Sequence, residues 1–165
     1  MPEDRPVNTR LRYLAMKTAD AVALKGGGTD DNANLPEKLV SDGSGYPCRH
    51  CLRDIAKGRP MLLLAWNPFE NRHAYSETGP VFLCEHACVR HNESSGLPQV
   101  VKVRPRFMLR GYGPDERIVD GSGAMVETSD IEPFAHKLLH NPAIASVYIR
   151  SGTNTCFICR VVKVG

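Results

Sequence analysis

Two pairs of cysteines constrain this chain more than any other feature of its sequence. Cys48 and Cys51 form a Cys-x2-Cys motif, and Cys84 and Cys88 follow beyond residues 52–83. A Cys-x2-Cys turn presents two thiolates to one ion, and Zn²⁺ takes four sulfur or nitrogen ligands in a tetrahedron. The sequence therefore predicts a zinc-knuckle-like turn at the first pair. It also predicts a structural zinc ion, the expected cofactor, held by ligands from both pairs.

The second pair leaves more than one interpretation open. His86 lies between Cys84 and Cys88, so it can replace one of their thiols as a ligand. Cys84 also ends an apolar run that begins at Pro80, and free cysteine is among the most buried residue types. An inert core thiol is therefore a competing interpretation. The candidate metal ligands are Cys48, Cys51, Cys84, His86 and Cys88.

Two further motifs do not indicate metal sites. Cys156 and Cys159 also form a Cys-x2-Cys motif, but residues three apart in a strand point to opposite faces. His136 and His140 are four residues apart on an expected helix, opposite its apolar stripe, and Lys137 stands where zinc proteases have glutamate. We therefore expect separate thiols and surface histidines at these positions.

The length and charge of the chain indicate one ordinary globular domain that does not bind nucleic acid. The 165 residues carry 21 basic and 18 acidic side chains, and we expect a single domain over residues 1–165. The densest basic stretch, residues 102–106, has no interleaved aromatic residues. This pattern favours a solvated strand edge over a phosphate-binding stripe.

No segment of the sequence is expected to enter a membrane. The residues after Met1 lack the apolar core of a secretory signal. The longest fully apolar run, Met61–Trp66, is far shorter than the roughly 20 residues that a membrane-spanning helix needs. We therefore expect an intracellular, cytoplasmic protein in a reducing compartment, where its six cysteines are thiols or metal ligands rather than disulfides.

The distribution of apolar runs and turn residues predicts an α+β fold with a mainly antiparallel β-sheet. One helix is well defined at about 129–141, because apolar residues recur there at helical spacing. Residues 24–47 are poor in apolar periodicity, and we expect a long mobile loop with a short helix near residues 36–40. Strands are expected at residues 11–16, 61–66, 80–84, 100–103, 107–112, 116–119, 146–150 and 156–164, the last two as a hairpin.

Several segments carry a family resemblance. Tyr46–Asp54, Met61–Leu64, Asn67–Phe69 and Tyr75–Phe82 resemble a bacterial family named only as domain of unknown function 1203. Leu109–Tyr112, Val147–Arg150, Cys156, Phe157 and Arg160 resemble its closing strands. The resemblance covers residues 46–164 and implies no established activity. Some family members have serine at the position of Cys51 and lack counterparts of Cys84 and Cys88, which implies that a metal site belongs to a subgroup of the family.

Four polar residues of the matched segments suggest a second site. Arg49, Tyr75, Glu77 and Arg150 lie inside or beside otherwise apolar segments. Buried charges need partners, so we expect Glu77 to pair with Arg49 or Arg150. One interpretation is an ion pair that fixes the fold. The other is a pocket in which arginine binds a small anionic ligand and Glu77 or Tyr75 orients it.

Two functions from different classes follow from these patterns. The first is a binding module for a small anionic ligand or a protein partner, with structural zinc at the cysteine pairs. The alternative is a thiol- or metal-dependent enzyme that uses Cys48 or Cys51 with His50 or His86. No recognised nucleophile motif surrounds these cysteines, so the sequence favours the module over the enzyme.

Overall fold

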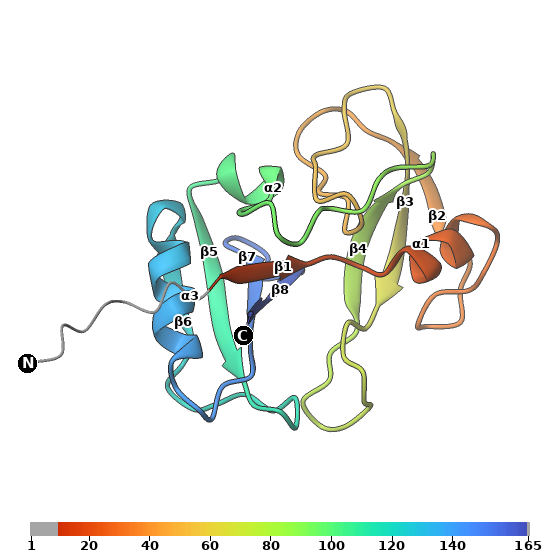
Figure 1. Ribbon diagram of the computed structural model, residues 1–165. Coiled ribbons are helices and arrows are strands. Elements are labelled where there is room, and N and C mark those ends of the chain that lie inside the picture. Colours follow the sequence, from red (N-terminus) through yellow and green to blue (C-terminus); the bar gives the residue numbers. More distant parts are fainter. Residues whose placement is uncertain (1–9, 165) are drawn as a thin grey trace, which may run out of the picture.

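Two antiparallel sheets form the framework of the protein, whose residues 10–164 are described by a computed structural model. The five-stranded sheet has the order β1-β8-β7-β5-β6, and the three-stranded sheet has the order β2-β3-β4. Figure 1 shows the two sheets beside each other, the larger one on the left. The strands are β1 (Leu11–Leu14), β2 (Glu37–Val40), β3 (Pro60–Trp66), β4 (Gly79–Cys84), β5 (Arg106–Tyr112), β6 (Ala124–Glu127), β7 (Ser146–Ser151) and β8 (Phe157–Lys163).

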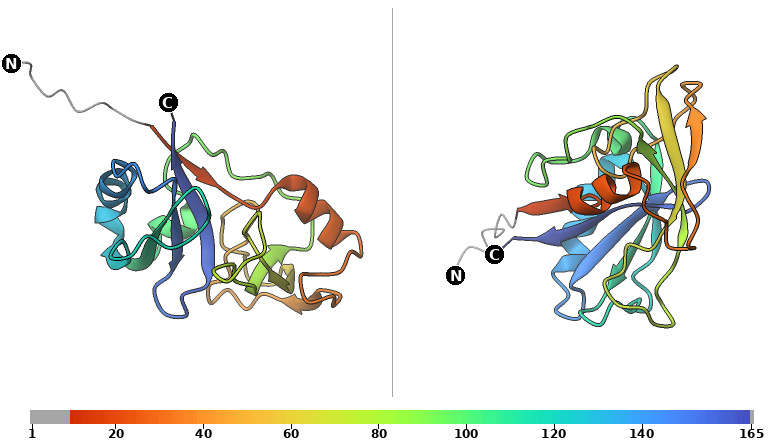
Figure 2. Two further views of the ribbon diagram at one scale, coloured as in Figure 1. Left: turned by 90° about the horizontal axis from the view of Figure 1, so that it is seen from below. Right: turned by 90° about the vertical axis from the view of Figure 1, so that its right-hand side faces the viewer.

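The larger sheet packs against the main helix. This helix, α3 (Ile131–Leu139), follows a 3-10 turn, η1 (Thr128–Asp130), and buries Ile131, Ala135 and Leu139 at helical spacing. Alternate residues of β5, including Phe107 and Leu109, are fully buried in the same core. The alternation of buried and exposed residues lets one face of the sheet carry a helix. The left view of Figure 2 shows this helix, in blue, beside the sheet. We call the five-stranded sheet with α2 (Gln99–Lys102) and α3 the five-stranded half.

The smaller sheet has its own core. β3 and β4 pair in a register that places Met61 opposite Cys84. Ala21 of α1 (Thr18–Lys25) is buried against this sheet, whereas all four residues of the edge strand β2 are exposed. We call this sheet, α1 and the turn of residues 47–54, hereafter the knuckle turn, the three-stranded half.

Aromatic side chains fill the space between the halves. Trp66, the last residue of β3, packs edge-on against Phe157, the first residue of β8, with ring centroids 5.5 Å apart. Phe69 contacts both Tyr112 and Tyr148, which stack on each other with centroids 4.1 Å apart. These rings form a continuous apolar connection from the end of β3 to β5 and β7.

The expected fold class is confirmed, because the sheets are antiparallel and the best-defined helix covers residues 128–139. The hairpin of the two last strands is also observed, as β7 and β8. Among residues 10–164, no helix combines the length and the apolar character that crossing a bilayer demands. The extent of the domain and the mobility of residues 24–47 remain predictions.

Three local expectations were wrong. Residues 100–103, expected as a strand, lie largely in α2, where Val100 and Val101 are both buried, which an alternating strand does not allow. Residues 36–40, expected as a helix, contain β2, because Leu39 pairs across the sheet with Met61. Residues 116–119, expected as a strand, make only a single bridge, from Ile118 to Tyr112, and the strands that pair with β5 are β6 and β7.

Candidate metal centre

Four cysteine sulfurs converge at one point of the three-stranded half. The Sγ atoms of Cys48, Cys51, Cys84 and Cys88 all lie within 4.8 Å of one another. The distance from Cys48 to Cys88 is 4.0 Å, and the distance from Cys51 to Cys84 is also 4.0 Å. A tetrahedron with zinc–sulfur bonds of about 2.3 Å has edges of about 3.8 Å. All four are free thiols, and together they could hold one metal ion.

The knuckle turn presents the first two sulfurs. The backbone amide of Leu52 donates to the carbonyl of Cys48 at 2.9 Å, and the amide of Cys48 donates to the carbonyl of Arg53 at 3.0 Å. Leu52 closes this turn with a left-handed backbone, φ 53°. Its side chain is fully buried in the core of the five-stranded half, which fixes the turn in place.

The end of β4 supplies the other two sulfurs. Cys48 forms a parallel bridge with Phe82, which places the knuckle turn beside β4 two residues before Cys84. The chain then turns back, so that Cys88 reaches the same point as Cys84. Lys25 at the end of α1 donates from Nζ to the carbonyl of His86 at 2.9 Å, which holds this turn against the helix.

Hydrogen-bond donors surround the sulfurs. His50 Nδ1 lies 3.1 Å from Cys88 Sγ, and Lys25 Nζ donates to the same sulfur at 3.5 Å. The backbone amide of Cys84 donates to Cys48 Sγ at 3.4 Å. One Zn²⁺ with four thiolates carries a net charge of −2, and such donors stabilise a charge of this sign.

The acid–base behaviour of the four thiols is linked. Hydrogen bonds from Cys51, and then from Cys84 and Cys88, lower the pKa of Cys48 far below that of a free thiol. Hydrogen bonding to Cys48 raises the pKa values of Cys84 and Cys88. Ionisation of Cys48 therefore opposes ionisation of the other three thiols. A divalent cation bound at the centre would supply positive charge that favours the ionised thiols.

The comparisons with known proteins concern the family. Residues 45–163 match the model of the family described as "Protein of unknown function (DUF1203)". The chain belongs to this family. No curated protein and no solved structure matches the chain. All four cysteines lie in the DUF1203 region, whereas Lys25 precedes it.

Other candidate metal ligands lie outside the group of four. His86 is not part of the group, and its carbonyl, rather than its ring, receives the hydrogen bond from Lys25. Cys156 and Cys159 lie in the DUF1203 region but do not join the sulfur group. Cys159 is fully buried, and burial raises its pKa to about 12.

The expected ion pair of the second site is observed, with an additional member. Glu77 accepts a hydrogen bond from Arg150 Nη2 at 2.7 Å, and Arg110 Nη1 lies 3.3 Å from the other carboxylate oxygen. Glu77 precedes β4, whereas Arg110 and Arg150 belong to β5 and β7. The pair therefore bridges the two halves of the DUF1203 region.

The other two members of the expected site lie elsewhere. Arg49 is buried and donates to the carbonyls of Phe157 at 2.6 Å and Pro47 at 2.5 Å. Tyr75 is exposed, with the Arg117 guanidinium 5.6 Å from its ring centroid. The structure thus brings together Glu77 and Arg150 but not the whole set of four.

Sequence reasoning missed the groups that surround the sulfurs. The sequence suggested His50 as a further metal ligand or as a catalytic partner of Cys48 or Cys51. In the structure its Nδ1 contacts Cys88, its Nε2 lies 2.9 Å from Thr18 Oγ1, and it is not part of the sulfur group. Lys25 and Thr18 come from α1, more than 20 residues before the first cysteine. No local pattern marks either residue, because only tertiary packing brings α1 to the sulfur group.

Proposed function

We propose that this protein is a binding module whose three-stranded half is held together by one structural zinc ion. The observation that carries the proposal is the closed set of four sulfurs from Cys48, Cys51, Cys84 and Cys88. Structural zinc sites have four protein ligands, whereas catalytic sites keep one position for water or substrate. Four cysteines fill the tetrahedron, so the ion serves stability rather than chemistry.

The ligand chemistry supports zinc over other divalent cations. Soft thiolate ligands in a tetrahedron favour Zn²⁺ or iron–sulfur chemistry, whereas Mg²⁺ and Ca²⁺ need oxygen ligands. The compact size of the sulfur group, with separations of 4.0 Å, suits a single ion. A reducing cytoplasm, which we infer for this protein, keeps the thiols available to the ion.

Metal analysis with thiol counting tests the proposal. Protein purified from zinc-supplemented cells is expected to contain one zinc per chain, released when a mercurial reagent titrates four thiols. Cys51→Ser and Cys84→Ser are expected to abolish the zinc. Cys156→Ser is the matched control, since this half-buried thiol lies outside the group, and it should retain the metal. Metal-free protein whose four thiols react as fast as glutathione contradicts the proposal.

A second candidate function rests on the contact between His50 and Cys88. A thiol 3.1 Å from a histidine nitrogen, with Thr18 on the other ring nitrogen, has the order of nucleophile, base and orienting group. In this alternative Cys88, rather than Cys48 or Cys51, is the nucleophile of a thiol enzyme. It predicts that iodoacetamide at neutral pH alkylates Cys88 of metal-free protein much faster than the other thiols, and that His50→Gln removes the difference. Uniformly slow alkylation excludes this alternative.

A further inference from the structure

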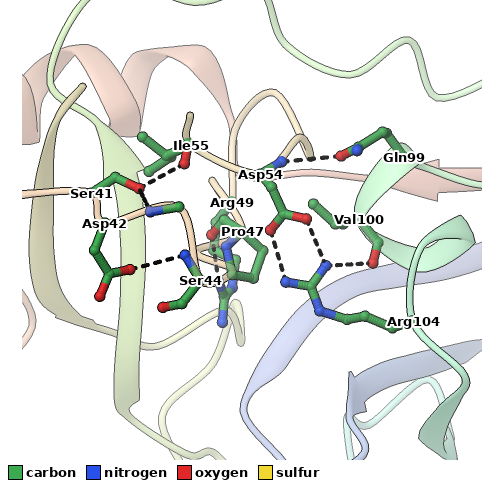
Figure 3. A network of polar contacts seen from close by, with 11 residues as sticks. Ser41, Asp42, Ser44, Pro47, Arg49, Asp54, Ile55, Gln99, Val100 and Arg104 are labelled. Atoms are coloured by element: carbon green, nitrogen blue, oxygen red, sulfur yellow. Dashed lines mark hydrogen bonds and ion pairs between the residues drawn. The ribbon is translucent and has the colours of Figure 1, made fainter. Parts of the chain in front are cut away.

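A basic cavity lies where the knuckle turn meets the five-stranded half. Its volume is about 680 Å³, and its lining includes Arg49, Arg104, Arg106 and residues of the loop between β7 and β8. None of its lining residues is an aspartate or a glutamate. Figure 3 shows Arg49 and Arg104 in the network at this junction. The cavity is separate from the sulfur group, whose four cysteines do not line it.

Two of the three arginines have carboxylate partners. Arg104 forms a two-point ion pair with Asp54, with nitrogen–oxygen distances of 2.7 and 3.0 Å (Figure 3). Arg106 Nε lies 3.8 Å from a carboxylate oxygen of Glu127, and both side chains are more than half exposed. The positive charge of Arg104 is therefore balanced within the protein, and that of Arg106 is hydrated.

Arg49 has no such partner. Arg49 is 3% exposed, and its guanidinium donates hydrogen bonds from Nε and Nη1 to two backbone carbonyls. Among residues 10–164, no carboxylate oxygen lies within 4.0 Å of its guanidinium. Burial lowers the pKa of Arg49 to about 10, so the side chain is still charged at neutral pH. A buried charge without a counter-ion is costly, unless a ligand supplies the opposite charge.

We propose that this cavity binds a small molecule through an oxyanion group, a carboxylate or a phosphate, which pairs with Arg49. A guanidinium has five N–H donors in a planar fork, and the protein carbonyls engage only two of its three nitrogens. Ser151, Thr153 and Asn154 line the same cavity and supply further polar groups. The inference deepens the proposed binding module by naming its ligand class.

A neighbouring cavity provides a contrast. It is lined by Glu77 and Arg150, and Glu77 already neutralises Arg150 at 2.7 Å. Asn154 and Cys156 line both cavities, so the loop between β7 and β8 separates them. Arg150 holds this loop by donating from Nε to the carbonyl of Thr155 at 2.8 Å. Of these two cavities, the one at Arg49 combines a buried guanidinium with the lack of a carboxylate partner among residues 10–164.

Cys156 provides a reporter for the test. Its thiol lines the cavity, is half-buried and lies outside the sulfur group. Iodoacetate and iodoacetamide both alkylate a thiolate by displacement of iodide, but only iodoacetate is an anion. Peptide mass spectrometry gives the rate of each reaction at Cys156. The ratio of the iodoacetate rate to the iodoacetamide rate is expected to be several-fold higher at Cys156 than for the thiol of glutathione. Inorganic phosphate or acetate at millimolar concentration is expected to slow the iodoacetate reaction, and the effect should level off once the anion site is saturated.

Three variants define what the reporter measures. Arg49→Gln is expected to bring the rate ratio to that of glutathione and to remove the protection by phosphate. Because a buried residue is changed, circular dichroism must show that the variant is folded. Arg106→Gln, at the exposed rim, gives a smaller reduction and keeps the test valid if Arg49→Gln does not fold. Arg12→Gln, an exposed arginine of β1, is the control and should leave the ratio unchanged.

Zinc content is measured on the same samples, so that the two proposals can fail separately. Suppose that protein with one bound zinc shows the same rate ratio as glutathione and no protection by phosphate or acetate. This result overturns the anion-site proposal, whereas the zinc proposal stands. A high ratio that phosphate suppresses, in protein without zinc, supports the anion site and overturns the zinc proposal.

Discussion

The two halves of this protein are stabilised in different ways. In the five-stranded half, Phe107, Leu109, Val147 and Ile149 are all fully buried, and α3 covers the sheet. In the three-stranded half, the edge strand β2 is fully exposed, and sulfur-containing side chains form much of the core. The larger half can rely on apolar burial, whereas the smaller half combines a small core with a potential metal cross-link.

This difference gives a physical reason for the position of the four clustered cysteines. A small core buries too little apolar surface to offset the conformational entropy lost on folding, and small natural folds add metals or disulfides for this reason. An ion at the sulfur group would tie the knuckle turn to the end of β4, two segments that otherwise share few backbone hydrogen bonds.

Loss of the metal is expected to affect one half far more than the other. Structural zinc contributes on the order of 10 kcal/mol to the folding of zinc-finger peptides. In Cys84→Ser we therefore expect hydrogen exchange to rise by orders of magnitude in β3, β4 and the knuckle turn, and much less in β5 and β7. Exchange measured by mass spectrometry checks this, with Cys156→Ser as control. Equal acceleration in both halves contradicts the contrast.

Truncation of a core side chain in the five-stranded half should destabilise the protein without releasing zinc from the folded state. Phe107→Ala removes a fully buried ring and is expected to cost about 3–5 kcal/mol in the free energy of unfolding. Urea unfolding followed by circular dichroism measures this loss. The folded variant should keep its full zinc content, since Phe107 belongs to the other core. Zinc release at urea concentrations where the variant is still folded argues against separate stabilisation.

The donor to Cys88 is expected to tune the affinity for zinc. Loss of a hydrogen bond to a metal ligand typically reduces metal affinity about 10- to 100-fold. We expect a reduction in that range for His50→Ala, which removes the contact at 3.1 Å, measured by competition with a chromophoric chelator. His140→Ala, at the exposed end of α3, is the control. Unchanged affinity in His50→Ala indicates that the contact does not stabilise a metal-bound thiolate.

The ion pair between the halves should contribute least. Glu77 is 42% exposed while Arg150 is 10% exposed, so solvent weakens the pair but does not remove it. Glu77→Gln is expected to cost about 1 kcal/mol in the free energy of unfolding. Glu127→Gln, in the exposed pair with Arg106, should cost close to nothing and serves as control in the same urea titration. Equal losses in the two variants refute a bridging role for Glu77.

The sequence was most informative where the chemistry is local. The spacing of Cys48 and Cys51 alone predicts a turn that presents two sulfurs, and α3 follows from the periodicity of its apolar residues. The position of the second cysteine pair could not be predicted from spacing, because it depends on the bridge between Phe82 of β4 and the knuckle turn. Only this arrangement selects Cys88 rather than His86 as the fourth member of the group.

Short elements were predicted poorly because their neighbours determine them. β2 has no buried residue, so it forms through backbone pairing with β3 rather than through any apolar pattern of its own. The four residues of α2 follow Pro98, and Val100 and Val101 are consecutive buried residues that sequence patterns cannot distinguish from a strand. The isolation of Arg49 from Glu77 was equally invisible, since it depends on how β8 passes the knuckle turn.

X-ray absorption at the zinc edge identifies the ligands of a zinc ion bound by the four cysteines. We predict that the purified protein holds one zinc ion with four sulfur ligands at about 2.3 Å. A shell with nitrogen or oxygen ligands near 2.0–2.1 Å, or protein that retains no zinc, would contradict it.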